Sequence, residues 1–358
     1  MANYGHGGNA KEISRLNNIR YEDIIDFSAN INPLGMPENV KQDIKNNLNL
    51  LEKYPDINYL ELKESIAEFE NVDIHNIILG NGAADVIYNV IRAIEPKKVL
   101  TLAPTFSEYE EAVNSVNGKT VFYTLSEKND FNVKEEIIEC LNEDIDILVI
   151  CNPNNPTGTL IEKKLMKKIT QKAKEYNIFV LVDESFLDFI GPDNCMISYI
   201  KEFNNLVIIK SLTKFFAIPG IRIGYGILEN QKIIDKVEKI SPAWNINTIA
   251  DIATKGSLKD KAYIKNTIEY VNAEKTYLYK KMQNIEGIKV FKPSVNYIFF
   301  KSEFKLDLKL ELIKYNILIR DCSNYKGLEN GYYRIAVKTH EENKIIIKYL
   351  KKIFDIKK

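Results

Sequence analysis

The stretch that decides the fold reads Ser211-Leu-Thr-Lys214-Phe-Phe-Ala-Ile-Pro-Gly220-Ile-Arg222-Ile-Gly224. It follows the apolar run 206–209, which predicts a buried strand, so its lysine stands where a strand ends. A lysine amine is a useful nucleophile toward an aldehyde when its site lowers its pKa, and we interpret Lys214 as such a Schiff-base lysine. Ser211 and Arg222 can bind a phosphate through a hydroxyl and a guanidinium group.

Strands and helices are predicted to alternate ahead of this stretch. Apolar runs indicate strands at 77–79, 98–102, 119–123, 145–150, 178–182 and 206–209, with amphipathic helices such as 162–176 between them. This alternation is typical of an α/β domain with a mostly parallel sheet. After residue 228, longer helices and short strands predict a smaller α+β domain. We therefore expect an N-terminal substrate arm in 1–35, a large cofactor-binding domain in 36–230 and a small domain in 231–358.

The composition points to small-molecule partners. The 49 basic residues cancel the 49 acidic ones, so no summed field would attract nucleic acid or an anionic membrane. Four cysteines without C-x-x-C spacing and three scattered histidines argue against a zinc site and a disulfide framework. No apolar run is long enough for a membrane span, and the N-terminus lacks a signal-peptide pattern. We expect a cytoplasmic protein.

Three further motifs are predicted at strand ends. Asn152-Pro-Asn-Asn155-Pro-Thr-Gly158 follows 145–150, and Asp183-Glu-Ser follows 178–182. Gly80-Asn-Gly-Ala83-Ala84-Asp85 leads from strand 77–79 into a helix, whose first N–H groups can hold a phosphate with help from the helix dipole. In open α/β sheets ligands bind at the carboxyl ends of the strands, where all these motifs are expected.

In this order, the motifs resemble those of fold-type I pyridoxal-phosphate enzymes of the aspartate aminotransferase superfamily. Over essentially the whole chain, the sequence is most similar to the threonine-phosphate decarboxylase family of cobalamin biosynthesis, with the histidinol-phosphate aminotransferases as nearest relatives. The other segments that carry this resemblance are His6-Gly-Gly-Asn9, Asp26 to Gly35, Tyr54-Pro-Asp56, Ile317-Leu-Ile-Arg320 and Tyr332-Tyr-Arg334. Two positions depart from the aminotransferases: Phe186 replaces a tyrosine, and Ile31 a glutamate.

The resemblance implies pyridoxal phosphate as cofactor and gives its contacts to particular residues. Asp183 would keep the ring nitrogen protonated, Asn155 would hydrogen-bond O3′ and also contact substrate, and Phe106 would stack on the ring. Ser211, Arg222 and the N–H groups of Ala83 and Ala84 would hold the phosphate. Tyr54 would reach that phosphate from a second subunit, which implies a homodimer with shared active sites.

The resemblance also implies a substrate with two anions. Arg334 would bind the α-carboxylate and Arg320 the substrate phosphate, with help from His6, Gly7, Asn9 and Asn32. The expected reaction is decarboxylation of O-phospho-L-threonine to (R)-1-aminopropan-2-yl phosphate and CO2, for the aminopropanol arm of cobalamin. The alternatives are a histidinol-phosphate aminotransferase and a decarboxylase of O-phospho-L-serine, since one methyl group discriminates only about 10- to 200-fold. A binding module that lost its chemistry is disfavoured because the lysine and aspartate are retained.

Overall fold

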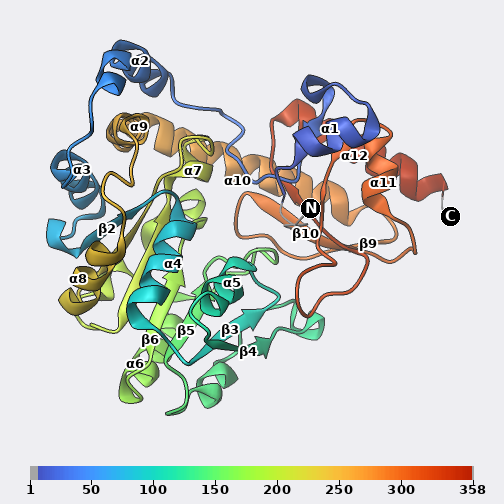
Figure 1. Ribbon diagram of the computed structural model, residues 1–358. Helices are drawn as coiled ribbons and strands as arrows, with labels where there is room; N and C mark the ends of the chain where they lie inside the picture. Colours follow the sequence, from blue (N-terminus) through green and yellow to red (C-terminus); the bar gives the residue numbers. More distant parts are fainter. Residues whose placement is uncertain (1–6, 357–358) are drawn as a thin grey trace.

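A seven-stranded sheet forms the centre of the larger domain in the computed structural model, which describes residues 7–356 (Figure 1). Its strands lie in the order β2 (Ile77–Gly80), β8 (Gly224–Leu228), β7 (Leu206–Ser211), β6 (Phe179–Asp183), β5 (Ile147–Cys151), β3 (Lys98–Ala103) and β4 (Lys119–Thr124). All neighbours pair in parallel except β8, which is antiparallel to both β2 and β7. This architecture confirms the predicted α/β class.

Helices cover both faces of this sheet, because alternate side chains of a strand point to opposite faces. In β5, Leu148 and Ile150 pack into one core and Ile147 and Val149 into the other. The second core is closed by α4 (Ala83–Ile94), α5 (Glu108–Asn114) and α8 (Gln231–Ile240). The first is closed by α2 (Glu38–Asn46), α3 (Leu60–Glu70), α6 (Lys163–Glu175) and α9 (Thr248–Lys259).

The smaller domain is built on a four-stranded antiparallel sheet in the order β12 (Arg320–Asp321), β13 (Tyr332–Ala336), β10 (Tyr297–Ser302) and β9 (Ile288–Val290). Its helices are α10 (Lys261–Gln283), α11 (Leu308–Ile313) and α12 (His340–Ile356). The N-terminal arm lies on this domain, because β1 (Ile25–Asp26) pairs in parallel with β11 (Ile317–Leu318) and α1 (Ala10–Asn17) packs on Ile313.

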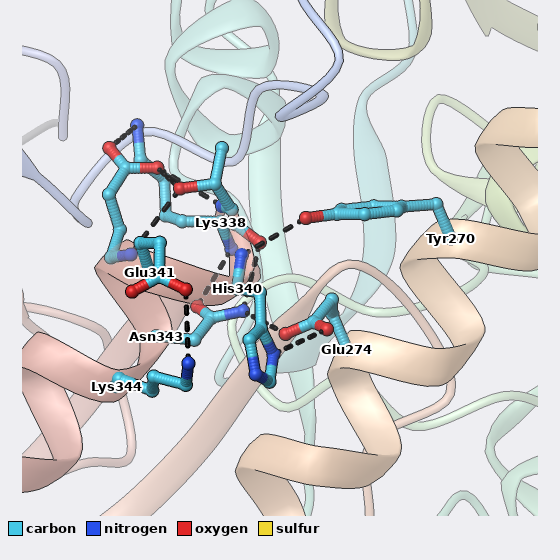
Figure 2. A network of polar contacts seen from close by, with 9 residues as sticks. Tyr270, Glu274, Lys338, His340, Glu341, Asn343 and Lys344 are labelled. Carbon is cyan, nitrogen blue, oxygen red and sulfur yellow. Dashed lines mark hydrogen bonds and ion pairs between the residues drawn. The ribbon is translucent and has the colours of Figure 1, made fainter.

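A polar network fastens α12 to α10 (Figure 2). Glu274 of α10 accepts a hydrogen bond from Asn343 at 2.8 Å and lies 2.9 Å from Nδ1 of His340. Tyr270, one turn earlier, accepts the backbone N–H of His340. The long helix α10 thus holds the start of α12 in place.

The structure differs from the sequence-based elements in three places. Strand β8 was not predicted, because its sequence Gly-Tyr-Gly-Ile-Leu reads as a turn. Between the strands predicted at 119–123 and 145–150 we expect a helix from residue 132, but the chain forms a 3₁₀ segment there, at Glu135–Cys140. Helices α8 and α9, which lie within the range 231–358 predicted for the small domain, pack on α4 and α2 of the large domain. Within residues 7–356, no helix has the length and apolar character that crossing a membrane requires.

Candidate active site

The carboxyl ends of three neighbouring strands bring the predicted motifs together. Asp183 ends β6 and pairs with Cys151, the last residue of β5, and with Ile209 of β7. Ser211 ends β7, and the single-turn helix α7 (Leu212–Phe215) carries Lys214 directly after it. Side chains that lie 28 to 60 residues apart in the sequence therefore share one edge of the sheet.

Lys214 is half-buried beside a hydroxyl group and an aromatic ring. Its Nζ lies 3.3 Å from Oγ of Ser211 and 5.3 Å from the centre of the Phe186 ring. Burial lowers the pKa of Lys214 and the positive charge of Arg222 lowers it further, against the opposing effect of Asp183. A lowered pKa increases the neutral fraction of the amine, which is the nucleophilic form.

Asp183 is buried and held by donors to both carboxylate oxygens. The hydroxyl of Tyr109 donates at 2.7 Å, and the backbone N–H of Ser185 donates at 2.9 Å. Burial, with the charge of Asp183, raises the pKa of Tyr109 well above its usual value, so this phenol remains a donor. Tyr109 also packs edge-on against Phe106, with ring centres 5.7 Å apart. Tyr109 has no signal in the sequence, because it is a buried helical residue.

A cradle of donors lies where α4 begins. A Cβ atom added to Gly82 would lie 2.4 Å from Nη2 of Arg222, and one added to Gly224 would lie 2.3 Å from the Ala83 nitrogen. Only glycine therefore allows Arg222 and β8 to approach the first turn of α4 so closely. Ser211 lies in the same region and exchanges a 2.9 Å hydrogen bond with Thr213, a further hydroxyl that was not predicted.

Two arginines stand directly opposite each other on neighbouring strands. Arg320 of β12 is the register partner of Arg334 of β13. Arg334 is buried and donates to Oδ1 of Asn155 and, at 2.8 Å, to the carbonyl of Ser28. Arg320 donates to Asn324 at 2.8 Å. Among residues 7–356, the Nε atoms of both arginines are buried without a hydrogen-bond acceptor.

The N-terminal arm reaches the same place. A Cβ atom on Gly7 would lie 2.2 Å from the Ser28 carbonyl oxygen, to which Arg334 also donates. Gly8 donates its N–H to Oγ of Ser28 at 2.9 Å, whereas Asn9 is directed to Glu12. His6 lies outside the described residues.

Asn32 contacts α7 and α10, and the substrate contact expected for it stays a prediction. Its Nδ2 donates to the Phe215 carbonyl at 2.7 Å and to Tyr263 and Thr267 at 2.8 Å each, and its backbone N–H donates to the carbonyl of Lys214. Its donors are thus occupied by α7 and α10. Asn32 thus holds the backbone of Lys214 and Phe215 in place.

Tyr54 lies on the surface between α2 and α3. It is 81% exposed, and its ring centre is 4.7 Å from that of Trp244. Further large apolar side chains are exposed on the neighbouring segments, at Leu48, Leu50, Leu51, Ile57, Leu60 and Ile240. Within the single chain, no described contact joins Tyr54 to the phosphate cradle.

A family model for aminotransferases of class I and II matches residues 22–350. The chain belongs to this family. It is 38% identical to a putative threonine-phosphate decarboxylase from Caldanaerobacter subterraneus, over 99% of this chain and 95% of that protein. It is 33% identical to the threonine-phosphate decarboxylase of Salmonella typhimurium, over 99% and 97%. The crystal structure of a histidinol-phosphate aminotransferase from Clostridium acetobutylicum superposes with a TM-score of 0.87 at 34% identity, over 92% and 98%.

The geometry of the strand ends fits pyridoxal phosphate, the cofactor of this family. Lys214 offers an amine with a lowered pKa, Asp183 a buried carboxylate for a ring nitrogen, and the glycine-lined start of α4 a cradle for a phosphate. When bound, the cofactor supplies a ring that accepts the electron pair released at the substrate α-carbon. Among residues 7–356, no group of three potential metal ligands is found.

Proposed function

We propose that this protein decarboxylates O-phospho-L-threonine to (R)-1-aminopropan-2-yl phosphate and CO2, which provides the aminopropanol arm of cobalamin. The opposed pair Arg320 and Arg334 carries this proposal. Arginines at opposed positions of an antiparallel pair carry their positive charges on the same face of the sheet, and a phosphorylated amino acid supplies two anions for them. The full-length similarity to threonine-phosphate decarboxylases supports the same substrate.

In this reaction, different residues of the chain bind the substrate, hold the cofactor and transfer a proton. Arg334 binds the α-carboxylate and Arg320 the phosphate, which together fix the orientation of the α-carbon. Lys214 binds the cofactor and returns a proton to the α-carbon after CO2 has left, while Phe106 packs on the ring. Asp183 keeps the ring nitrogen protonated, and an ion pair at about 4 Å is worth roughly 4 kcal/mol at an effective dielectric near 20. Gly7 and Asn9, with His6, complete the phosphate end.

The proposal includes a homodimer in the cytoplasm. The exposed apolar side chains around Tyr54 and Trp244 form the surface that a second copy would cover. In that dimer, Tyr54 of one subunit contacts the phosphate cradle of the other, formed by Ser211, Arg222 and the first turn of α4.

A histidinol-phosphate aminotransferase is the second candidate, because a solved structure of that activity superposes closely. Histidinol phosphate has no carboxylate, so Arg334 would then serve the amino-group acceptor instead. The test is to incubate cofactor-loaded enzyme with O-phospho-L-threonine, with and without 2-oxoglutarate, and to measure CO2 and glutamate. We expect CO2 release that does not depend on the keto acid. Glutamate formed from histidinol phosphate and 2-oxoglutarate, without CO2, would refute the proposal; O-phospho-L-serine tests the methyl preference.

A further inference from the structure

The connection between β12 and β13 crosses from the small domain to the large one. These strands are neighbours, yet residues 322–331, here called the strap, descend toward β3 and β4 instead of forming a tight turn (Figure 1). Lys326 lies 3.0 Å from Glu110 of α5 and 3.9 Å from the centre of the Phe122 ring in β4. Leu328 packs against the main core of the large domain. The strap therefore fixes Arg320, which precedes it, relative to the cofactor end of the sheet.

Tyr325 is the buried residue in the middle of the strap. The guanidinium carbon of Arg320 lies 5.1 Å from the centre of its ring, and its hydroxyl donates to Oδ1 of Asn155 at 3.3 Å. Two backbone hydrogen bonds, with Cys322 and Leu328, fix its position. Burial raises the pKa of Tyr325, so the hydroxyl stays protonated and remains a donor. One side chain thus contacts a substrate-binding candidate and a cofactor-binding candidate.

The two adjacent asparagines show what this contact does. Asn154 is satisfied within the protein: its Nδ2 donates to Pro104 and Thr157, and its Oδ1 accepts from Thr105. Asn155 accepts at Oδ1 from both Tyr325 and Arg334, and its Nδ2 has no acceptor among the described residues. Because both donors hold the oxygen, the amide nitrogen is the side of Asn155 left for a ligand.

We propose that Tyr325 is a positioning residue that couples the two halves of the site. It holds the amide nitrogen of Asn155 toward O3′ of the cofactor, and it supports the guanidinium of Arg320 that receives the substrate phosphate. Binding of a phosphate at Arg320 thereby changes the hydrogen bond that Asn155 donates to O3′ of the cofactor. The inference rests on the proposed function for the identity of the phosphate compound. The contact from Tyr325 through Asn155 to the cofactor does not depend on which reaction the enzyme catalyses.

The alternative is that Tyr325 only packs the domain interface, and a matched pair of variants separates the two. Tyr325→Phe removes the hydroxyl bonded to Asn155. Tyr332→Phe removes a hydroxyl that is bonded to Glu127 and makes no described contact with Asn155 or Arg320. The readout is the pH midpoint of the visible absorption band in substrate-free, cofactor-loaded enzyme. We expect Tyr325→Phe to raise this midpoint by about 0.5 unit, because a weaker hydrogen bond to O3′ favours the protonated form of the bound cofactor. Tyr332→Phe should leave it unchanged.

The coupling between phosphate binding at Arg320 and the pH midpoint of the cofactor is measured in the same samples. Inorganic phosphate should shift the midpoint in the native protein and in Tyr332→Phe, but less in Tyr325→Phe. The KM for O-phospho-L-threonine should rise about two- to fivefold in Tyr325→Leu, which removes the ring that the guanidinium group of Arg320 contacts.

A double-mutant cycle locates the effect. In an Asn155→Ala background, Tyr325→Phe should add no further shift of the midpoint. An unchanged midpoint in Tyr325→Phe, or an equal shift in the Asn155→Ala background, would overturn the inference. If the midpoint shifts as expected while no variant releases CO2 from O-phospho-L-threonine, the positioning role stands and the proposed substrate is wrong.

Discussion

Lys210 and Lys214 are four residues apart, yet their surroundings are opposite. Lys210 is buried in β7, with Nζ 2.7 Å from Asp188, 3.8 Å from Glu70 and 3.9 Å from Glu184. Lys214 contacts a serine hydroxyl and a phenylalanine ring, and no carboxylate lies within ion-pair distance of it in residues 7–356. Lys210 is buried and Lys214 is half-buried, but only Lys210 is surrounded by carboxylates.

The difference appears in the direction of their pKa values. Burial by itself lowers the pKa of Lys210, but Asp188 and Glu70 outweigh it and raise this pKa well above its usual value. Burial also lowers the pKa of Lys214, and there the charge of Asp183 does not outweigh it. A buried lysine is therefore a structural cation or a nucleophile according to its neighbours, and three substitutions test this contrast.

Replacing the nucleophile should have the largest effect. Lys214→Ala is expected to lower CO2 release from O-phospho-L-threonine by at least about a thousandfold, because the amine both holds the cofactor and carries a proton. The rate is measured with excess pyridoxal phosphate, and thermal melting controls for folding. Full activity of this variant would rule out the site described above.

Replacing the structural cation should damage the fold instead. Lys210→Met leaves three carboxylates around an apolar side chain, and we expect a loss of about 3 to 5 kcal/mol in the free energy of unfolding, measured by urea denaturation. Lys167→Met is the matched control: Lys167 pairs with Glu202 at 3.0 Å on the surface, and its loss should cost less than about 1 kcal/mol. Equal costs for the two would show that burial makes no difference to these ion pairs.

The smallest expected effect is a change in pH dependence. Burial raises the pKa of Glu184 to about 7, against the opposing charge of Lys210. A carboxyl group whose pKa is higher in the folded than in the unfolded state stabilises the fold. This stabilisation is complete at pH values below the unfolded-state pKa, and it is lost as the pH rises through about 7. Stability should thus fall between roughly pH 5 and pH 8, by about 3 kcal/mol at most. Glu184→Gln should flatten this part of the curve; an unchanged slope would assign the titration to another group.

Much of the site could be predicted from sequence because its residues follow strands. Asp183, Asn155 and Lys214 come after apolar runs, and the edge of a parallel sheet gathers such positions. Tyr109 and Tyr325 were missed because a buried tyrosine in a helix or loop has no sequence signal of the partner that its hydroxyl contacts. The contacts of Asn32 could not be predicted for the same reason: its amide points to α7 and α10, which lie about 180 to 230 positions later in the chain.

The sequence alone determined the α/β class and the strands that precede β8, and it predicted the lysine, aspartate and arginine set, since these depend on local periodicity and on motifs. The tertiary structure alone decided that Arg320 faces Arg334, that β8 runs antiparallel, that α8 and α9 pack on the large domain, and that Lys210 and Lys214 differ. These features depend on contacts between residues far apart in the chain. A pKa or a hydrogen bond is set by what surrounds a group in space, and local sequence does not specify that.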